Sequence, residues 1–198
     1  MNCTVVTEYT RDLFGFDIAQ FNQAAEKAVP GCDGVFILPY LNGERTPNFP
    51  HGRCSIEGLT AGNYTKENIC RAAMESAVFA MKGGLELFTK LGFKAKEIRL
   101  IGGGAKSKLW RQIAADIMNL PIVLPLYDEA AALGGALQAL YVLSKSEGKN
   151  VSFADLCAEH VLLDDSAATL PNPANKSVYE ERYKEYQTMV NHLKDLYE

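Results

Sequence analysis

The 198-residue sequence has no apolar run of the roughly 18 residues that a membrane span requires, and it has no cluster of basic residues. The net charge is −4, and the lysines and arginines are scattered along the chain. Nucleic acids and anionic membranes attract clustered basic residues, so we expect neither as a partner. The start of the chain also lacks a basic segment followed by an apolar one, which predicts a cytoplasmic protein.

The cysteines and histidines indicate neither a disulfide framework nor a metal site. The five cysteines are an odd number, lie far apart and include no Cys-x-x-Cys pair, which is typical of reduced thiols in the cytoplasm. The three histidines are isolated, so we expect packing or surface roles for them. A composition of 47% hydrophobic and 22% charged residues fits a single globular domain over residues 1–198.

Short apolar runs alternate with amphipathic stretches, and this alternation predicts an α/β domain with a partly parallel sheet. Residues 165–198 are expected to form a linker and then a tail helix with a stripe of tyrosines. We expect this stripe to make core contacts in a full-length protein, whereas in an isolated domain it would be partly exposed and would favour a homodimer. The expected helices cover residues 4–14, 17–29, 65–91, 106–118, 128–146, 153–160 and 176–197. The expected strands cover 35–41, 55–59 and 120–126, and 97–103 is expected to be a strand that runs into a turn.

The most informative stretch is RLIGGGAKSKLWRQI, residues 99–113, in which three glycines separate an expected strand from an expected helix. Gly102, Gly103 and Gly104 have no side chains, so a flat base or a pyrophosphate can lie against their backbone. The alternative is a tight turn that uses glycine only for its backbone freedom. The segment does not match a P-loop, and Ser107 stands where the dinucleotide fingerprint G-x-G-x-x-G needs glycine. Asp128 and Glu129 leave a nicotinamide-dinucleotide module open as a weaker alternative.

Four segments together resemble the C-terminal half of the FGGY carbohydrate kinases. The order and spacing of the four agree with that family, and each contributes a recognisable motif. One departure is Cys54, where the family signature has glycine, serine or alanine. The segments are LPYLNGERTP (38–47), CSIEGLTAGNYTKENICRAAMES (54–76), LIGGGAKSKLWRQIAADIMNLPI (100–122) and EAAALGGALQAL (129–140).

The resemblance implies the actin-like ATPase fold, also called ribonuclease H-like, with a mixed sheet flanked by helices. It implies two domains around a cleft, with the sugar on an N-terminal domain that these residues do not include and ATP on the C-terminal one. It places Gly103, Gly104 and Ala105 along the adenosine and α-phosphate side of ATP, and Gly102 is expected to bind the nucleotide with them. It also places Lys108 near the adenine edge and Glu8 close to the nucleotide.

No catalytic residue is expected in this chain, because the resemblance places the catalytic aspartate and the residues that hold Mg²⁺ in the missing half. The chain alone is therefore expected to bind ATP or ADP without catalysing phosphoryl transfer, which needs both walls of the cleft. The resemblance favours D-xylulose as the sugar, with gluconate, ribulose or another polyol as alternatives. A non-catalytic interaction domain is a further alternative. Glu44 and Arg45 either face the cleft or brace their loop, and we favour bracing.

Overall fold

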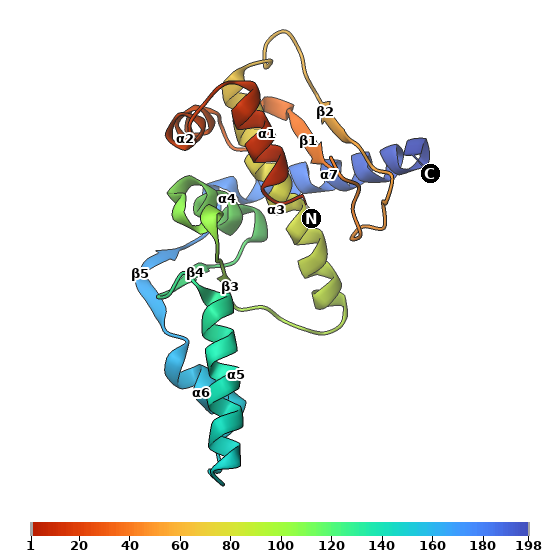
Figure 1. The fold of residues 1–198 in the computed structure, drawn as a ribbon. Coiled ribbons are helices and arrows are strands. Elements are labelled where there is room, and N and C mark those ends of the chain that lie inside the picture. The colour runs from red at the N-terminus through yellow and green to blue at the C-terminus, as the bar shows by residue number, and fades with distance from the viewer. Residues whose placement is uncertain (1, 198) are drawn as a thin grey trace.

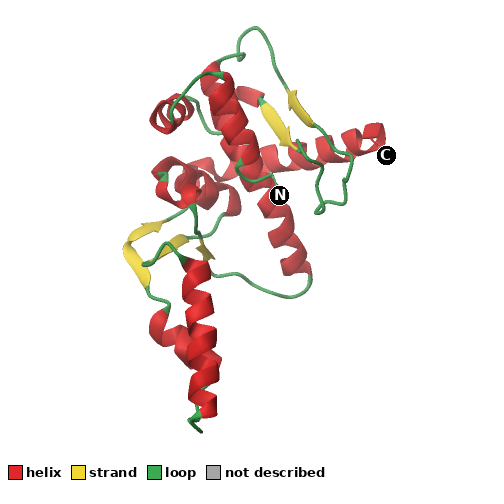
Figure 2. Ribbon diagram, viewed as in Figure 1, coloured by secondary structure: helices red, strands yellow, loops and turns green. Residues whose placement is uncertain are grey.

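The structure is a computed structural model that describes residues 2–197. Helices predominate, and the strands are short (Figures 1 and 2). The α-helices are α1 (Val5–Leu13), α2 (Ile18–Lys27), α3 (Lys66–Lys90), α4 (Lys108–Met118), α5 (Ala130–Ser146), α6 (Phe153–His160) and α7 (Lys176–Tyr197). The strands are β1 (Phe36–Pro39), β2 (Cys54–Glu57), β3 (Ile98–Arg99), β4 (Ile122–Pro125) and β5 (Leu163–Thr169), and the 3-10 helices are η1 (Cys32–Gly34), η2 (Gly103–Lys106) and η3 (Pro173–Asn175).

Helix α3 is the centre of the packed body, and α1, α2, α4 and β1 contact it. Its N-terminus is fixed by Thr65, whose side chain accepts a hydrogen bond from the Asn68 backbone N–H. Every residue from Asn68 to Phe79 is buried. Small residues such as Ala73 and Ala77 let neighbouring elements approach the helix closely. The boundaries agree closely with the expected helix over 65–91.

The strands form two separate sheets. Strands β1 and β2 are an antiparallel pair, with Phe36 opposite Glu57. The second sheet has the order β3-β4-β5, in which β3 and β4 are parallel and β4 and β5 are antiparallel. The expected mixture of strands and flanking helices is present, and the parallel pair lies next to the glycine turn.

Of two local expectations, one is confirmed and one is wrong. The segment 97–103 is a strand that runs into a turn, as expected: β3 ends at Arg99, and the glycines lead into the 3-10 helix η2. The expected linker contains strand β5. Its sequence, LDDSAAT, has little intrinsic strand propensity, and it is extended because it pairs with β4.

The tyrosine stripe of the tail helix makes core contacts within this chain, so the core role expected of it is present and the exposure expected of an isolated domain is not. Tyr183 and Tyr186 stack on Phe79 of α3, with ring centroids 6.1 and 5.4 Å away. The hydroxyl groups of Tyr186 and Tyr40 are hydrogen bonded at 2.8 Å. Helix α7 is thereby part of the core, so the stripe gives no support to a homodimer.

Helices α5 and α6 contact each other and project from the packed body (Figure 1). Helix α5 exposes apolar side chains, among them Val142 and Leu143. Among residues 2–197, no helix combines the length and the apolar character that crossing a membrane requires.

Candidate functional site

A cavity of about 190 Å³ opens between the glycine turn and helices α1, α2, α3 and α4. Its inner wall is apolar, with the buried side chains of Phe21 and Met74 and the ring of Trp110. Ligand pockets for drug-sized molecules are roughly 300–1,000 Å³, so this cavity suits one ring system and leaves the rest of a larger ligand outside. The lining residues are Thr4, Thr7, Glu8, Arg11, Ile18, Phe21, Asn22, Met74, Gly103, Gly104, Ser107 and Trp110.

The three glycines of the turn have different structural roles. Gly102 has a φ of 86°, a conformation that favours glycine, and it begins the 3-10 turn. A Cβ on Gly103 would meet nothing within 4 Å, so bare main chain faces open space there. A Cβ on Gly104 would lie 2.9 Å from Cε3 of Trp110, so the indole ring excludes a side chain at this position.

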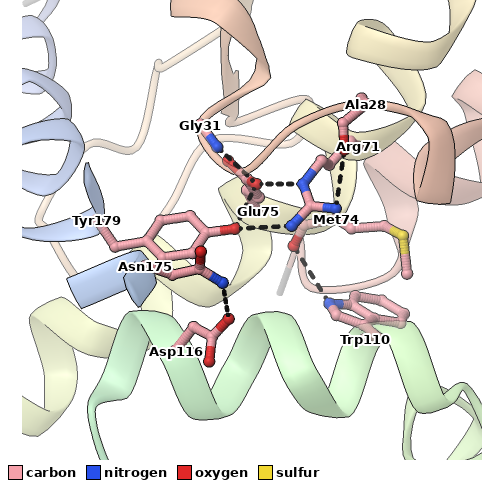
Figure 3. A network of polar contacts seen from close by, with 9 residues as sticks. All are labelled: Ala28, Gly31, Arg71, Met74, Glu75, Trp110, Asp116, Asn175 and Tyr179. Atoms are coloured by element: carbon pink, nitrogen blue, oxygen red, sulfur yellow. Dashed lines mark hydrogen bonds and ion pairs between the residues drawn. The ribbon is translucent and has the colours of Figure 1, made fainter. Parts of the chain in front are cut away.

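The first turn of α4 is tied to the helices around the cavity. Ser107 caps α4 by accepting a hydrogen bond from the Trp110 backbone N–H at 3.2 Å, and its hydroxyl donates to Oδ1 of Asn22 at 2.9 Å. Trp110 Nε1 donates to the Met74 carbonyl oxygen at 3.2 Å (Figure 3). These bonds hold the glycine turn against α2 and α3.

Glu8 is the one carboxylate that lines the cavity. It is exposed, and within residues 2–197 its side chain makes no hydrogen bond or ion pair. The other polar side chains of α1 that line the cavity are engaged, because Thr7 donates to the Thr4 carbonyl oxygen and Arg11 pairs with Asp12, both at 2.7 Å. A flat apolar wall with an acceptor at its rim suits a heterocyclic base that carries an exocyclic amine.

The structure brings together some of the residues predicted from the sequence and leaves others apart. Glu8, Gly103 and Gly104 line the cavity. Gly102 shapes the turn without lining the cavity, and Ala105 is buried beside β3 and β4, where it lines a separate hollow with Leu100. Lys108 is exposed at the start of α4 and does not line the cavity. The placement predicted for Ala105 and Lys108 is therefore not supported.

Sequence reasoning missed nine of the twelve residues that line the cavity. Only Trp110 carried a usable signal, because it is the single tryptophan of the chain and it closely follows the glycines. The others come from segments up to about 100 positions apart, which become neighbours only in the fold. The missed residues that matter most for the site are Thr7, Asn22, Met74, Ser107 and Trp110.

A buried polar network connects α3 to α7 (Figure 3). Glu75 Oε1 accepts hydrogen bonds from Arg71 Nε at 2.8 Å, the Tyr179 hydroxyl at 2.7 Å and the Gly31 N–H at 3.2 Å. Burial and the neighbouring Glu75 carboxylate raise the pKa of Tyr179, so this hydroxyl stays protonated. Burial lowers the pKa of Arg71, but Tyr179 and Glu75 outweigh that effect, so the guanidinium stays charged.

The loop that contains Glu44 and Arg45 is braced from within. Glu44 accepts hydrogen bonds from the Asn2 side chain at 3.0 Å and the Arg45 N–H at 2.9 Å. Burial raises the pKa of Glu44, but these hydrogen bonds outweigh that effect and lower it overall. The geometry favours the bracing role over a catalytic one.

Comparison with known proteins gives consistent matches. The family model for the FGGY family of carbohydrate kinases, C-terminal domain, matches residues 14–143. Xylulose kinase of Haemophilus influenzae is 44% identical over 197 residues, which cover 100% of this chain and 38% of that protein. The chain therefore spans about two fifths of the length of that relative.

Solved structures agree with this match. Ligand-bound xylulose kinase from Lactobacillus acidophilus has a TM-score of 0.88 at 27% identity, and the match covers 99% of this chain and 39% of that one. Gluconate kinase from the same organism has a TM-score of 0.87 at 27% identity, with the same coverage. The expected actin-like ATPase fold is thereby confirmed. The chain belongs to the FGGY family of carbohydrate kinases, of which it is a C-terminal domain.

Proposed function

We propose that this chain is the ATP-binding part of a sugar kinase and that the cavity at the glycine turn holds the adenine base. The observation that carries the proposal is that bare main chain at Gly103 and the Glu8 carboxylate, which has no partner among residues 2–197, border the same base-sized cavity. The adenine ring lies against Gly103 and the ring of Trp110. Glu8 accepts a hydrogen bond from the exocyclic amine.

The chain contributes positioning to the reaction, in which ATP transfers its γ-phosphoryl group to a sugar hydroxyl. Holding the base in the cavity leaves the phosphates outside it, directed toward a second wall of the cleft that the sugar-binding part supplies. Mg²⁺, when bound, would neutralise charge on the phosphates. We assign no residue of this chain to it, because residues 2–197 contain no group of three or more His, Cys, Asp or Glu side chains that could hold a metal ion.

We infer D-xylulose as the sugar and a pentulose 5-phosphate as the product. The support is the 44% identity over the whole chain to the Haemophilus influenzae xylulose kinase. Gluconate is the second candidate, because the Lactobacillus acidophilus gluconate kinase has nearly the same structural similarity as the xylulose kinase from that organism.

Isothermal titration calorimetry with ADP tests the nucleotide site. The 198-residue chain is expected to bind ADP and to ignore NADH, and Glu8→Ala should weaken ADP binding about tenfold because a hydrogen bond to a charged group is lost. Glu26→Ala is the matched control, since Glu26 is an exposed glutamate of α2 that does not line the cavity. NADH binding without ADP binding would favour the dinucleotide alternative and contradict the proposal.

A hybrid enzyme tests the kinase role. This chain would replace the matching part of the Haemophilus influenzae xylulose kinase, and the hybrid should phosphorylate D-xylulose with ATP. A second hybrid on the Lactobacillus acidophilus gluconate kinase should phosphorylate gluconate less efficiently, as judged by kcat/KM. A folded xylulose kinase hybrid that binds ADP but transfers no phosphoryl group would contradict the kinase role, and a more efficient gluconate hybrid would contradict the sugar assignment.

A further inference from the structure

We infer that Trp110 is the positioning residue of the nucleotide cavity and that its indole ring, rather than backbone conformation, makes glycine necessary at position 104. This inference rests on the proposed nucleotide site. It assigns to the single tryptophan a role in setting the Gly103–Gly104 main chain against which the base lies.

Trp110 is anchored at its ring and at its backbone. The indole Nε1–H donates to the Met74 carbonyl oxygen of α3 at 3.2 Å (Figure 3). The backbone N–H of Trp110 donates to the capping hydroxyl of Ser107 at 3.2 Å. Met74 is 1% exposed, so the acceptor is held within the core. The ring is therefore fixed between α3 and the glycine turn, and its position constrains the position of the turn.

Comparison of Gly102 with Gly104 separates backbone freedom from steric exclusion. Gly102 has a φ of 86°, and a Cβ there would meet nothing within 4 Å, so the backbone conformation and not a lack of space favours glycine at this position. No positive φ is found at Gly104, and a Cβ there would lie 2.9 Å from Cε3 and 3.1 Å from Cζ3 of Trp110. An alanine at 104 must therefore displace either the ring or the main chain, and both border the cavity.

A double-mutant cycle tests this coupling. Gly104→Ala should weaken ADP binding at least about tenfold, whereas Trp110→Phe should weaken it about fivefold through loss of the indole N–H bond and part of the ring. Phenylalanine has no counterpart of Cε3 and Cζ3, so adding Gly104→Ala to Trp110→Phe should cause less than a further threefold loss. Independent, multiplicative effects of the two substitutions would overturn the inference.

Two further readouts keep the test decisive. The same cycle measured by urea unfolding needs no nucleotide, and it should also show that Gly104→Ala is less destabilising when residue 110 is phenylalanine. In the unsubstituted chain, saturating ADP should at least halve acrylamide quenching of the tryptophan fluorescence, a change that a purely structural tryptophan would not show. The role of Trp110 would be overturned if ADP binds, the quenching does not change, and the effects of the two substitutions are independent. Absence of ADP binding, with the unfolding cycle still coupled, would instead overturn the proposed nucleotide site.

Discussion

At the scale of single residues, the feature with the largest expected effect on stability is the buried carboxylate of Glu75. It accepts three hydrogen bonds, and the Arg71 guanidinium beside it is also buried. Removal of one partner of a buried ion pair leaves the other charge uncompensated, and such changes cost about 3–5 kcal/mol. The network therefore fixes the position of α7 on α3 only as long as it is complete.

Glu75→Gln should lower the free energy of unfolding by about 3 kcal/mol, as measured by urea denaturation. The control is Glu180→Gln, which alters the ion pair of Glu180 with Lys176. Their side chains are 57% and 54% exposed. Exposed pairs contribute about 0–1 kcal/mol, so the control should change stability little. Equal effects of the two substitutions would show that the Glu75 network does not stabilise the fold.

We expect the buried thiol of Cys70 to cause a loss of stability at alkaline pH. Burial raises the pKa of this thiol to about 12, and the Glu67 carboxylate adds to the rise. A cysteine in the unfolded chain has a pKa of about 8.5, so above that pH the unfolded state loses a proton that the folded state keeps. The contribution of Cys70 to stability should be complete below pH 8.5 and fall by up to about 1.4 kcal/mol per pH unit toward pH 12.

Urea unfolding of the unsubstituted chain and of Cys70→Ala at pH 7.5, 9 and 10 measures this contribution. The difference in unfolding free energy between the two proteins should change steadily above pH 8.5, with the unsubstituted chain losing more stability. Parallel pH profiles would contradict the raised pKa of the buried thiol.

At the scale of secondary-structure elements, the N-terminus of α4 links local capping to the cavity. The hydroxyl of Ser107 caps the helix and also donates to Asn22 across the cavity rim. Ser107→Ala should reduce the free energy of unfolding by about 1 kcal/mol and should also weaken ADP binding, because the turn loses its tie to α2.

Ser152→Ala provides a matched test of that link. Ser152 caps α6 by accepting a hydrogen bond from the Asp155 N–H at 3.1 Å, and it lies outside the cavity lining. It should lower stability by a similar amount and leave ADP affinity unchanged. If Ser107→Ala also leaves ADP affinity unchanged, the bond to Asn22 has no part in shaping the cavity.

Elements with strong local signals were predictable, and elements made by pairing were not. The start of α3 follows from the capping side chain of Thr65, and the helical repeat of apolar and small residues carries it to Lys90. Strand β5 escaped prediction because its polar sequence becomes extended only by pairing with β4. The end of β3 follows instead from a local signal, since the glycines favour a turn.

At the scale of the whole molecule, the family and the fold could be predicted from four motifs in the right order, whereas the cavity could be predicted only in part. The glycine turn and Glu8 were expected at the site, and both line the cavity. Three other lining residues lie on different helices, Thr7 on α1, Asn22 on α2 and Met74 on α3. They become neighbours only because α1 and α2 pack on α3. The amphipathic stripe of the tail helix indicates an apolar face, but it does not show that this face packs on α3 within this chain.

The most direct test of the proposed function is the electron density of a crystal of this chain soaked with ADP. We expect density for the base between Glu8, the Gly103–Gly104 main chain and the ring of Trp110, with the phosphates outside the cavity. Density for ADP at another place on the molecule, or an empty cavity at a saturating concentration of ADP, would contradict it.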